Sequence, residues 1–304
     1  MVMQKNKKYD IVGIGNAIVD LIAEVDDSYL EKNSINKGSM SLVDYDVANR
    51  IGNEVDIVKT ISGGSVANSI VCIAQQNLKT VFIGKVNQDE LGEKFAKGLA
   101  EENVEFKITK SLANKHTARC IILVSTDAER TMNTYLGVSQ ELTEEDVDLN
   151  IIEESSILYL EGYLWDLDNA KKAIKKSIST AINSETKIAF SISDAFCVDR
   201  FREEFIDLVN NSADIIFANE SEIKSLFETN ELNDAIKKCQ DTKKIFAVTL
   251  GDKGAKIIYK NEVIDIKAEV INKLVDTTGA GDLFAAGFLA EYLKTQDLEL
   301  SGKQ

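Results

Sequence analysis

Short apolar runs rich in β-branched residues alternate along the chain with longer amphipathic stretches. The apolar runs have the length of buried strands and cover 9–14, 81–86, 120–124, 157–160, 187–192, 215–218 and 246–250. Between them, apolar residues recur every three or four positions, as on one face of a helix, over 65–76, 90–102, 169–183, 200–210, 221–227, 233–239 and 280–294. This alternation predicts an α/β fold in which crossover helices connect the strands of a largely parallel sheet.

Two stretches depart from this alternation, residues 20–60 and 107–134. Short alternating runs such as 39–43 and 118–125 predict extra strands there, which we interpret as a lid laid over one edge of the main sheet. No low-complexity linker or internal repeat is visible, so residues 1–304 are predicted to form one domain with the lid inserted. The acids that follow Thr143 indicate a helix start rather than a metal cluster.

Composition and charge narrow the class of protein. With 304 residues, 44% hydrophobic and 28% charged, the chain has the composition of a soluble globular protein. No apolar run approaches the roughly 18 residues that span a bilayer, and the first residues are basic and polar where a signal peptide is apolar, so we expect a cytoplasmic protein without a membrane partner. The formal net charge of −15 and the scattered basic residues argue against nucleic acid as a partner.

The cysteines and the histidine do not form a recognisable metal site or catalytic triad. Cys72, Cys120, Cys197 and Cys239 have no CxxC spacing and are expected to be reduced thiols, mostly buried. His116 is the single histidine, so neither a zinc site nor a Ser-His triad finds its usual residues. Proton transfer is therefore expected to fall to a carboxylate.

The most informative stretch is 275–288, where a strand end, a glycine-rich turn and a helix start follow one another. The free amides of Gly279, Ala280 and Gly281 would lie at the positive end of a helix dipole and hold an anion. Asp282 would be too close to that anion to bind it, but a carboxylate there could take a proton from a hydroxyl that attacks phosphorus. The alternative interpretation is an aspartate in the first turn of an ordinary helix.

A second glycine-rich turn precedes a helix near the other end of the chain. Gly63 and Gly64 lead into the stretch that carries Asn68 on its first turns, which we expect to face the same crevice. Two such helix starts suggest two ligands, or two ends of one reaction. A purely structural turn remains the alternative at this second position.

The two turns carry a resemblance to a known family. Residues 276–282 read Asp-Thr-Thr-Gly-Ala-Gly-Asp, and 62–69 read Ser-Gly-Gly-Ser-Val-Ala-Asn-Ser, followed by GKVNQDELG at 84–92. Together they resemble the C-terminal and N-terminal signatures of the ribokinase-like, pfkB-type carbohydrate and nucleoside kinases. The resemblance runs from about residue 9 to the end and implies a ribokinase-like fold with a small β lid, Asp282 as catalytic base, and Gly279, Ala280 and Gly281 as the anion hole for the transferred phosphoryl group.

Further elements resemble the nucleotide side of that family. Asn219 and Glu222 resemble its Asn-x-x-Glu element, in which Glu222 acts on Mg²⁺ through water and Asn219 helps to orient the phosphates of ATP. A helix N-cap with acids in the first turn is a second interpretation that is compatible with the first. Thr249, Gly251 and Gly254 resemble the nucleotide-binding strand end, although a strand followed by a hairpin turn is also consistent with them.

The end of the chain departs from the family pattern. Thr278 is expected beside ATP, and Asp276 with Thr278 resembles part of a site for a monovalent cation such as K⁺. Family members continue into another helix that completes the adenine pocket and this cation site, whereas here that segment would only begin at 301–304. We therefore expect either a truncated chain or a shortened branch of the family.

Acceptor specificity is interpreted from the start of the chain. Asn16 and Asp20 follow the first strand, and an amide with a carboxylate can bind vicinal sugar hydroxyls. Their Asn-x-x-x-Asp spacing resembles adenosine kinases and their bacterial relatives, which implies that Asp20, Gly63, Gly64 and Asn68 hold the ribose diol with Asn16 beside them. In the predicted lid, Met132 and Thr134 would flank the base, Arg130 would meet phosphate on closure, and Tyr135 or Phe196 would stack or pack.

The sequence thus predicts an ATP- and Mg²⁺-dependent kinase that phosphorylates the 5′-hydroxyl of a nucleoside, adenosine before others, in purine salvage. A free sugar such as ribose or fructose, or another nucleoside, is the alternative acceptor. A nucleoside-binding protein without catalysis is a further alternative. An NAD-dependent enzyme is disfavoured because Gly13 and Gly15 lack the third glycine of G-x-G-x-x-G, and no P-loop sequence is present. A monomer and a homodimer through the lid sheet both remain open.

Overall fold

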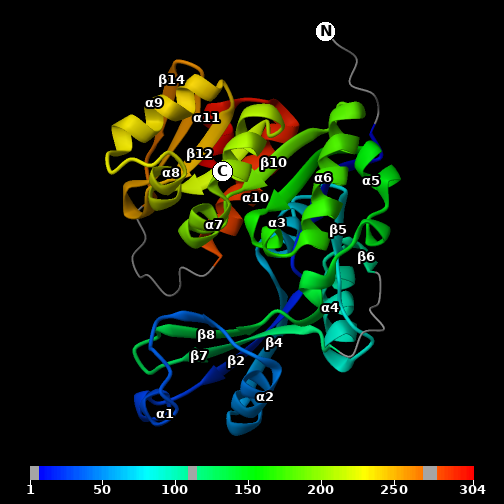
Figure 1. Cartoon of the computed structure of the whole chain (residues 1–304), viewed down its shortest axis with the longest axis vertical. Coiled ribbons are helices and arrows are strands. Elements are labelled where there is room, and N and C mark those ends of the chain that lie inside the picture. The colour runs from blue at the N-terminus through cyan, green and yellow to red at the C-terminus, as the bar shows by residue number, and fades with distance from the viewer. Residues whose placement is uncertain (1–6, 109–114, 270–278) are drawn as a thin grey trace.

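A nine-stranded sheet forms the centre of the computed structural model, which describes residues 7–108, 115–269 and 279–304 (Figure 1). From one edge to the other its strands are β6 (Glu105–Ile108), β5 (Thr80–Gly84), β1 (Tyr9–Ile14), β9 (Ser155–Glu161), β10 (Lys187–Ser191), β11 (Ile215–Asn219), β12 (Ile245–Thr249), β13 (Ala255–Tyr259) and β14 (Glu262–Ile266). The strands from β6 to β12 are parallel, and β13 and β14 add an antiparallel edge. The predicted α/β class with a largely parallel sheet is confirmed.

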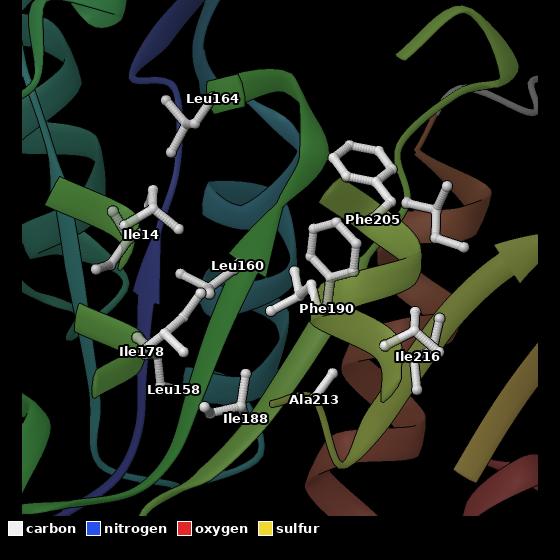
Figure 2. Close-up of a cluster of buried hydrophobic side chains, with 14 of the residues drawn as sticks. Ile14, Leu158, Leu160, Leu164, Ile178, Ile188, Phe190, Phe205, Ala213 and Ile216 are labelled. Atoms are coloured by element: carbon white, nitrogen blue, oxygen red, sulfur yellow. The ribbon is translucent and has the colours of Figure 1, made fainter. Parts of the chain in front are cut away.

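Helices cover both faces of this sheet. One face carries α5 (Leu149–Glu153), α6 (Asp168–Asn183), α7 (Ala195–Asn211), α8 (Glu220–Leu226) and α9 (Leu232–Thr242). The other carries α3 (Ser65–Ala74), α4 (Glu90–Glu101), α10 (Ala280–Thr295) and α11 (Leu298–Lys303). Figure 2 shows the first core, where Leu158, Leu160 and Phe190 of the sheet meet Ile178 and Phe205 of the helices. Two buried layers of apolar side chains therefore hold the strand ends in fixed positions.

A separate five-stranded sheet, called the small sheet below, lies apart from these layers (Figure 1). Its strands in order are β3 (Met40–Leu42), β8 (Arg130–Tyr135), β7 (Ala118–Val124), β2 (Ile18–Glu24) and β4 (Ile57–Gly63). Helices α1 (Asp27–Lys32) and α2 (Tyr45–Glu54) cover its outer face, where Ala23, Ile121 and Leu123 pack. Because side chains alternate along a strand, Asp20 and Cys120 face the opposite side, toward the large sheet.

The predicted strands and helices agree with the structure to within a few residues. Strands β13 and β14 and helices α1, α2 and α11 were not predicted, and two further elements differ locally. The helix start at Thr143 is a single 3₁₀ turn, Glu144–Asp146, closed by a capping box in which the Thr143 side chain and the Asp146 carboxylate bind each other's backbone. Helix α7 begins at Ala195, five residues before the predicted 200–210, because the Asp194 side chain caps it by accepting from the Cys197 N–H. Its first turn leaves Phe196 exposed, so the apolar pattern did not reveal it.

The four cysteines and His116, to which the sequence analysis assigned no catalytic role, lie in ordinary structural environments. Cys120, Cys197 and Cys239 are buried free thiols, and Cys72 is half-buried. His116 stacks on the ring of Tyr45, with the ring centroids 4.1 Å apart. In the part of the chain that the structure describes, no helix has the length and apolar character needed to cross a bilayer.

Candidate active site

A cavity of about 600 Å³ lies between the small sheet and the carboxyl ends of the parallel strands. Strand β1 pairs with β5 on one side and with β9 on the other, so the strand order changes direction between β1 and β9. In open α/β sheets, ligands bind beside such a switch point. Residues from β9, β10, β11, β12, the loop after β1, the small sheet and both glycine-rich turns line the cavity, including Asn16, Asp20, Gly64, Asn68, Met132, Thr134, Glu161, Asn219, Glu222, Thr249, Gly279, Ala280, Gly281 and Asp282.

The carboxylate of Asp282 joins the two glycine-rich turns. Its Oδ1 accepts a hydrogen bond of 2.6 Å from the Ser65 hydroxyl, and its Oδ2 accepts one of 3.0 Å from Asn68 Nδ2. The Ser69 hydroxyl also donates to the Asp282 backbone carbonyl at 2.8 Å. Burial raises the pKa of Asp282 above its ordinary value, and the bonds from Ser65 and Asn68 partly oppose that rise. The predicted convergence of the two turns is therefore present in the structure.

The start of α10 forms an open cradle beside this carboxylate. Gly279 is the N-cap residue with a φ of +73°, a conformation that favours glycine. Ala280 and Gly281 are exposed, and a Cβ placed on Gly281 would meet nothing within 4 Å. The backbone N–H groups of the first helical turn have no acceptor within the helix and point toward the positive end of its dipole. This turn can bind an anion next to Asp282.

Asp20 lies on β2 beside the second glycine turn. Burial raises the pKa of Asp20 to about 7, the charge of Arg130 lowers it, and the charge of Asp282 raises it further. A Cβ on Gly63 would lie 2.5 Å from Asp20 Oδ2, and one on Gly64, whose φ is +106°, would lie 2.2 Å from the Asn16 carbonyl oxygen. Gly64 lines the cavity, whereas Gly63 serves to let Asp20 approach the turn.

Asn16 and Glu161 meet at the switch point between β1 and β9. Glu161 is fully buried and accepts from the Asn16 backbone N–H at 2.9 Å, from Asn16 Nδ2 at 2.7 Å and from the Val66 N–H at 3.0 Å. Burial raises the pKa of Glu161 to about 7, and the three hydrogen bonds act in the opposite direction. The sequence analysis did not identify Glu161, because the strand predicted at 157–160 stopped one residue short of it.

The small sheet and the start of α7 provide the other walls. Met132 and Thr134 of β8 line the cavity beside Cys120, whose Sγ accepts a hydrogen bond of 3.2 Å from the Thr134 hydroxyl. Phe196 reaches the cavity from α7 with 76% of its surface exposed. An exposed aromatic ring at a cavity wall offers a surface on which a flat ligand can stack.

Asn219 and Glu222 form a capping box at the start of α8. The Asn219 side chain accepts from the Glu222 N–H at 2.9 Å, while the Glu222 carboxylate accepts from Asn219 N at 2.9 Å and Nδ2 at 2.6 Å. Burial raises the pKa of Glu222 to about 7, partly opposed by the Asn219 bond. The N-cap interpretation therefore describes the local structure, and both residues also line the cavity.

The residues around Glu222 could hold Mg²⁺ only through a water ligand of the ion. Among the described residues, no cluster of three or more acidic, histidine or cysteine side chains could hold a metal ion. Both Glu222 oxygens already accept a hydrogen bond, yet each has a second lone pair that a water ligand can use. Magnesium keeps several waters and takes its remaining ligands from phosphates, so one buried carboxylate is sufficient.

The residues predicted near ATP and the monovalent cation are only partly found at the described cavity wall. Thr249 lines it, but Gly251 and Gly254 lie in the turn between β12 and β13 and do not. Gly254 has a φ of +92°, and a Cβ on it would lie 2.0 Å from the Ile266 carbonyl oxygen, so the hairpin itself requires glycine here. Asp276 and Thr278 lie outside the described residues.

Further polar residues around the cavity complete the site and were missed. Ser65, Tyr163, Ser193, Asp194 and Arg200 also line the cavity. Ser65 and Glu161 share one signal that could have found them, because each is a polar residue directly after a predicted buried strand or glycine turn. The arrangement combines a proton acceptor, an anion cradle and a set of acceptors for hydroxyl groups.

Comparisons with known proteins agree with this geometry. Residues 10–304 match the model of a family described as pfkB family carbohydrate kinase. The chain superposes on the adenosine kinase of Sinorhizobium meliloti with a TM-score of 0.89 and 41% identity, over 97% of this chain and 91% of that one. It superposes on a Rhizobium etli protein named a probable sugar kinase with a TM-score of 0.90 and 38% identity, over 97% and 90%. The adenosine kinase of Saccharomyces cerevisiae is 26% identical over 316 residues, 96% of this chain and 91% of the yeast protein.

Proposed function

The chain belongs to the pfkB family of carbohydrate kinases, and from that premise we propose that it transfers the γ-phosphoryl group of ATP to the 5′-hydroxyl of adenosine. It is a phosphotransferase with an alcohol group as acceptor, and ATP is the co-substrate expected for kinases of this family. The choice of a nucleoside over a free sugar, and the roles of single residues, are the proposal.

One observation carries the chemical part of the proposal. Among the described residues, the Asp282 carboxylate is bound only by neutral donors, Ser65 and Asn68, at the start of a helix whose first N–H groups are open to the cavity. A base in that position takes the proton from the attacking hydroxyl. The amides of Gly279, Ala280 and Gly281 then stabilise the charge on the transferred phosphoryl group.

The acceptor is proposed from the two ends of the cavity. Asp20 presents carboxylate oxygens near Asp282, and Asn16 lines the cavity beside them, which suits a sugar diol whose free hydroxyl reaches the base. Met40, Leu42 and Met132 of the small sheet, together with Phe196 of α7, supply apolar surface against which a purine base can pack. A free sugar would leave that wall in contact with water.

ATP and Mg²⁺ are proposed to bind at the side of the cavity formed by β12 and the start of α8. Glu222 would hold Mg²⁺ through water, with Asn219 and Thr249 near the phosphates of ATP. The ion offsets charge on the phosphates when it is bound. Asp276 is proposed as part of a K⁺ site together with Thr278.

A free sugar such as ribose or fructose is the second candidate acceptor. Asn16 and Asp20 would bind the hydroxyls of a free sugar as well as those of a nucleoside, and the likeness to the Rhizobium etli protein favours this alternative. The apolar wall formed by Met40, Leu42, Met132 and Phe196 is the feature that distinguishes the two acceptors.

The test is release of ADP from Mg-ATP with a panel of acceptors, in the presence and absence of potassium. Adenosine, inosine, guanosine, cytidine, ribose, fructose and 2-keto-3-deoxygluconate are compared by kcat/KM, with Asp282→Asn as the inactive control. We expect adenosine to give the highest value. A free sugar as the best acceptor would retain the phosphotransfer and reject the nucleoside, and binding of adenosine without turnover would indicate a binding protein.

A further inference from the structure

Ser193 follows strand β10 in a backbone conformation that residues other than glycine rarely adopt. Its φ is +78°, and the Asp194 N–H donates to the Ile192 carbonyl oxygen, two residues back, at 3.1 Å. These features describe a γ-turn with a positive φ at its centre, the rarer and more strained of the two γ-turn forms. We call residues 192–194 the Ser193 turn. Strain of this kind persists only where the surrounding structure enforces it.

The Ser193 turn is tied to the loop after the neighbouring strand, β9. The Ser193 hydroxyl oxygen accepts from the Gly162 N–H at 2.8 Å, and the Ser193 carbonyl oxygen accepts from the Tyr163 hydroxyl at 3.3 Å. A Cβ on Gly162 would lie 2.6 Å from the Ile192 carbonyl oxygen, so the two loops are in close contact. Ser193 therefore holds the start of the 3₁₀ turn Gly162–Asp166, from which Tyr163 lines the cavity.

The same turn fixes the start of α7. The Asp194 side chain accepts from the Cys197 N–H at 2.6 Å and caps the helix. Phe196 lies in the first turn of α7 and lines the cavity, with most of its surface exposed. Because a capping side chain fixes where a helix begins, Asp194 also fixes the position of Phe196. Two aromatic side chains from different elements thus depend on one turn.

We infer that Ser193 is a positioning residue whose strained turn holds Tyr163 and Phe196 in the orientation in which they receive the base of the phosphoryl acceptor. The inference rests on the proposed function, since it assigns the two rings to a base, and it adds the residue that keeps them in place. Rings that are already fixed lose less conformational freedom when a flat ligand binds. The Ser193 turn therefore contributes to the affinity for the acceptor.

The hydroxyl group explains why a strained residue is useful at this position. Glycine would adopt the same φ without strain but has no hydroxyl to accept from the Gly162 N–H. Alanine would lack the hydroxyl and keep the strain. Both substitutions release the loop after β9, and only the alanine variant retains the strained φ, so the pair separates the strain from the hydrogen bond.

Urea unfolding of the two variants tests the strain. Ser193→Ala should unfold at a lower urea concentration than Ser193→Gly, because alanine is disfavoured at a positive φ. Ser212 is the matched control, since it lies at the other end of α7 with a φ of −130° and does not line the cavity. At that position the alanine variant should be the more stable, because alanine restricts the unfolded chain more than glycine does. The same order at both positions would overturn the inference.

Steady-state ADP release tests the positioning role. Both Ser193 variants should raise the KM of adenosine by about three- to tenfold, because the two rings must then be ordered by the ligand. The kcat should stay within about threefold of the wild type and the KM of ATP within about twofold, since Asp282 and the anion cradle lie on α10. Ser212→Ala should change none of the three values. A loss confined to kcat, or equal rises in the two KM values, would overturn the inference.

Hydrogen exchange of the ligand-free protein provides a readout without turnover. In both Ser193 variants, the amides of 162–166 and of 195–197 should exchange at least about threefold faster, while those of 157–160 in β9 should not change. Faster exchange in only one of the two segments would overturn the inference, because one turn would not then hold both rings. Absence of adenosine turnover by the wild type would reject the proposed function, and the exchange result would still decide whether Ser193 holds the two segments.

Discussion

The basicity of Asp282 follows from the kind of partner that holds it. In the described chain its carboxylate is bound by a hydroxyl and an amide, and no ion pair includes it. A lysine or arginine in contact would lower its pKa by attraction, whereas neutral donors orient the carboxylate at a smaller cost in basicity. Burial then raises the pKa, which favours transfer of a proton to it.

Asp282→Asn should lower kcat by about 10²- to 10⁴-fold, because the amide keeps the shape of the side chain but cannot accept the proton. The dissociation constants of ATP and of the acceptor should change by less than about threefold, since the anion cradle is made of backbone groups. Steady-state ADP release and calorimetry measure the two effects. Glu291→Gln, on the same helix but outside the cavity wall, is the control and should be neutral. Ordinary kcat in Asp282→Asn would remove Asp282 as the base.

Asp20→Asn should stabilise the fold at pH 8 and weaken binding of the acceptor. Burial raises the folded-state pKa of Asp20 to about 7 from 3.8, so between about pH 4 and 7 the native state binds more protons than the unfolded state. Stability of the wild type therefore falls as pH rises through this range. Removal of the charge should raise the free energy of unfolding by about 2–4 kcal/mol at pH 8 and by little at pH 4.

Urea unfolding of wild type and Asp20→Asn at the two pH values measures this difference, and acceptor KM at pH 8 is measured beside it. Equal stability of the two proteins at pH 8 would show that Asp20 is not held in a costly charged state. A loss of ATP affinity as large as the loss of acceptor affinity would contradict its assignment to the acceptor.

At the scale of elements, both glycine-rich turns adopt a backbone conformation at the helix start that favours glycine. Gly64 precedes α3 and Gly279 precedes α10, and both have positive φ. The turns place Ser65 and Asp282 within a hydrogen bond although 217 positions separate them. The chemistry of the cavity thus depends on backbone conformation at two positions that have no side chain.

Gly64→Ala should destabilise the protein by about 1–3 kcal/mol, because the backbone is strained for alanine and its Cβ would lie 2.2 Å from the Asn16 carbonyl oxygen. Gly52→Ala, inside α2 with nothing within 4 Å of its Cβ, should instead stabilise by about 0.5–1 kcal/mol. Chemical denaturation of the pair checks both signs. Similar effects of the two substitutions would mean that Gly64 has no special conformational role.

The sequence predicted those elements whose apolar residues recur with the period of a strand or a helix. Strands such as β1 and helices such as α10 bury a continuous face, and the pattern located them within a few residues. The first turn of α7 was missed because Phe196 faces the cavity and stays exposed, so it does not continue the buried apolar face of the helix. Glu161 was missed for a related reason, since its partners Asn16 and Val66 become neighbours only through the strand order. The motifs predicted which residues meet at Asp282, but long-range strand pairing decides what surrounds them.

At the scale of the whole molecule, the small sheet leaves apolar side chains uncovered on its cavity face. Met40 is 50% exposed and Leu42 is 58% exposed, and both line the cavity. Apolar surface that faces a ligand site favours closure over the ligand. The small sheet is part of the predicted lid. Helices α1 and α2 cover one of its faces, and its other face lines the cavity where a ligand would bind.

Hydrogen exchange of backbone amides should report such a closure. With the acceptor and a non-hydrolysable ATP analogue together, exchange should slow by at least about fivefold in β2, β3 and β8. The ATP analogue alone should protect the start of α10 and leave the small sheet nearly unchanged. Mass spectrometry of peptides from 18–24, 40–42 and 130–135 measures this. Equal protection with either ligand alone would argue against closure by the acceptor.

The order of strands in the small sheet also affects how the protein is made. Strand β2 lies between β4 and β7, so residues 18–24 lack their second partner until residues 118–124 have left the ribosome. At roughly 5–20 residues per second, β2 and β4 remain for several seconds as a two-stranded ribbon with an unpaired edge. Ribbons of that kind are marginally stable in water and available to other nascent chains. The yield of native protein in a cell is therefore expected to depend on the rate of translation between these strands and on chaperones that cover the waiting edge.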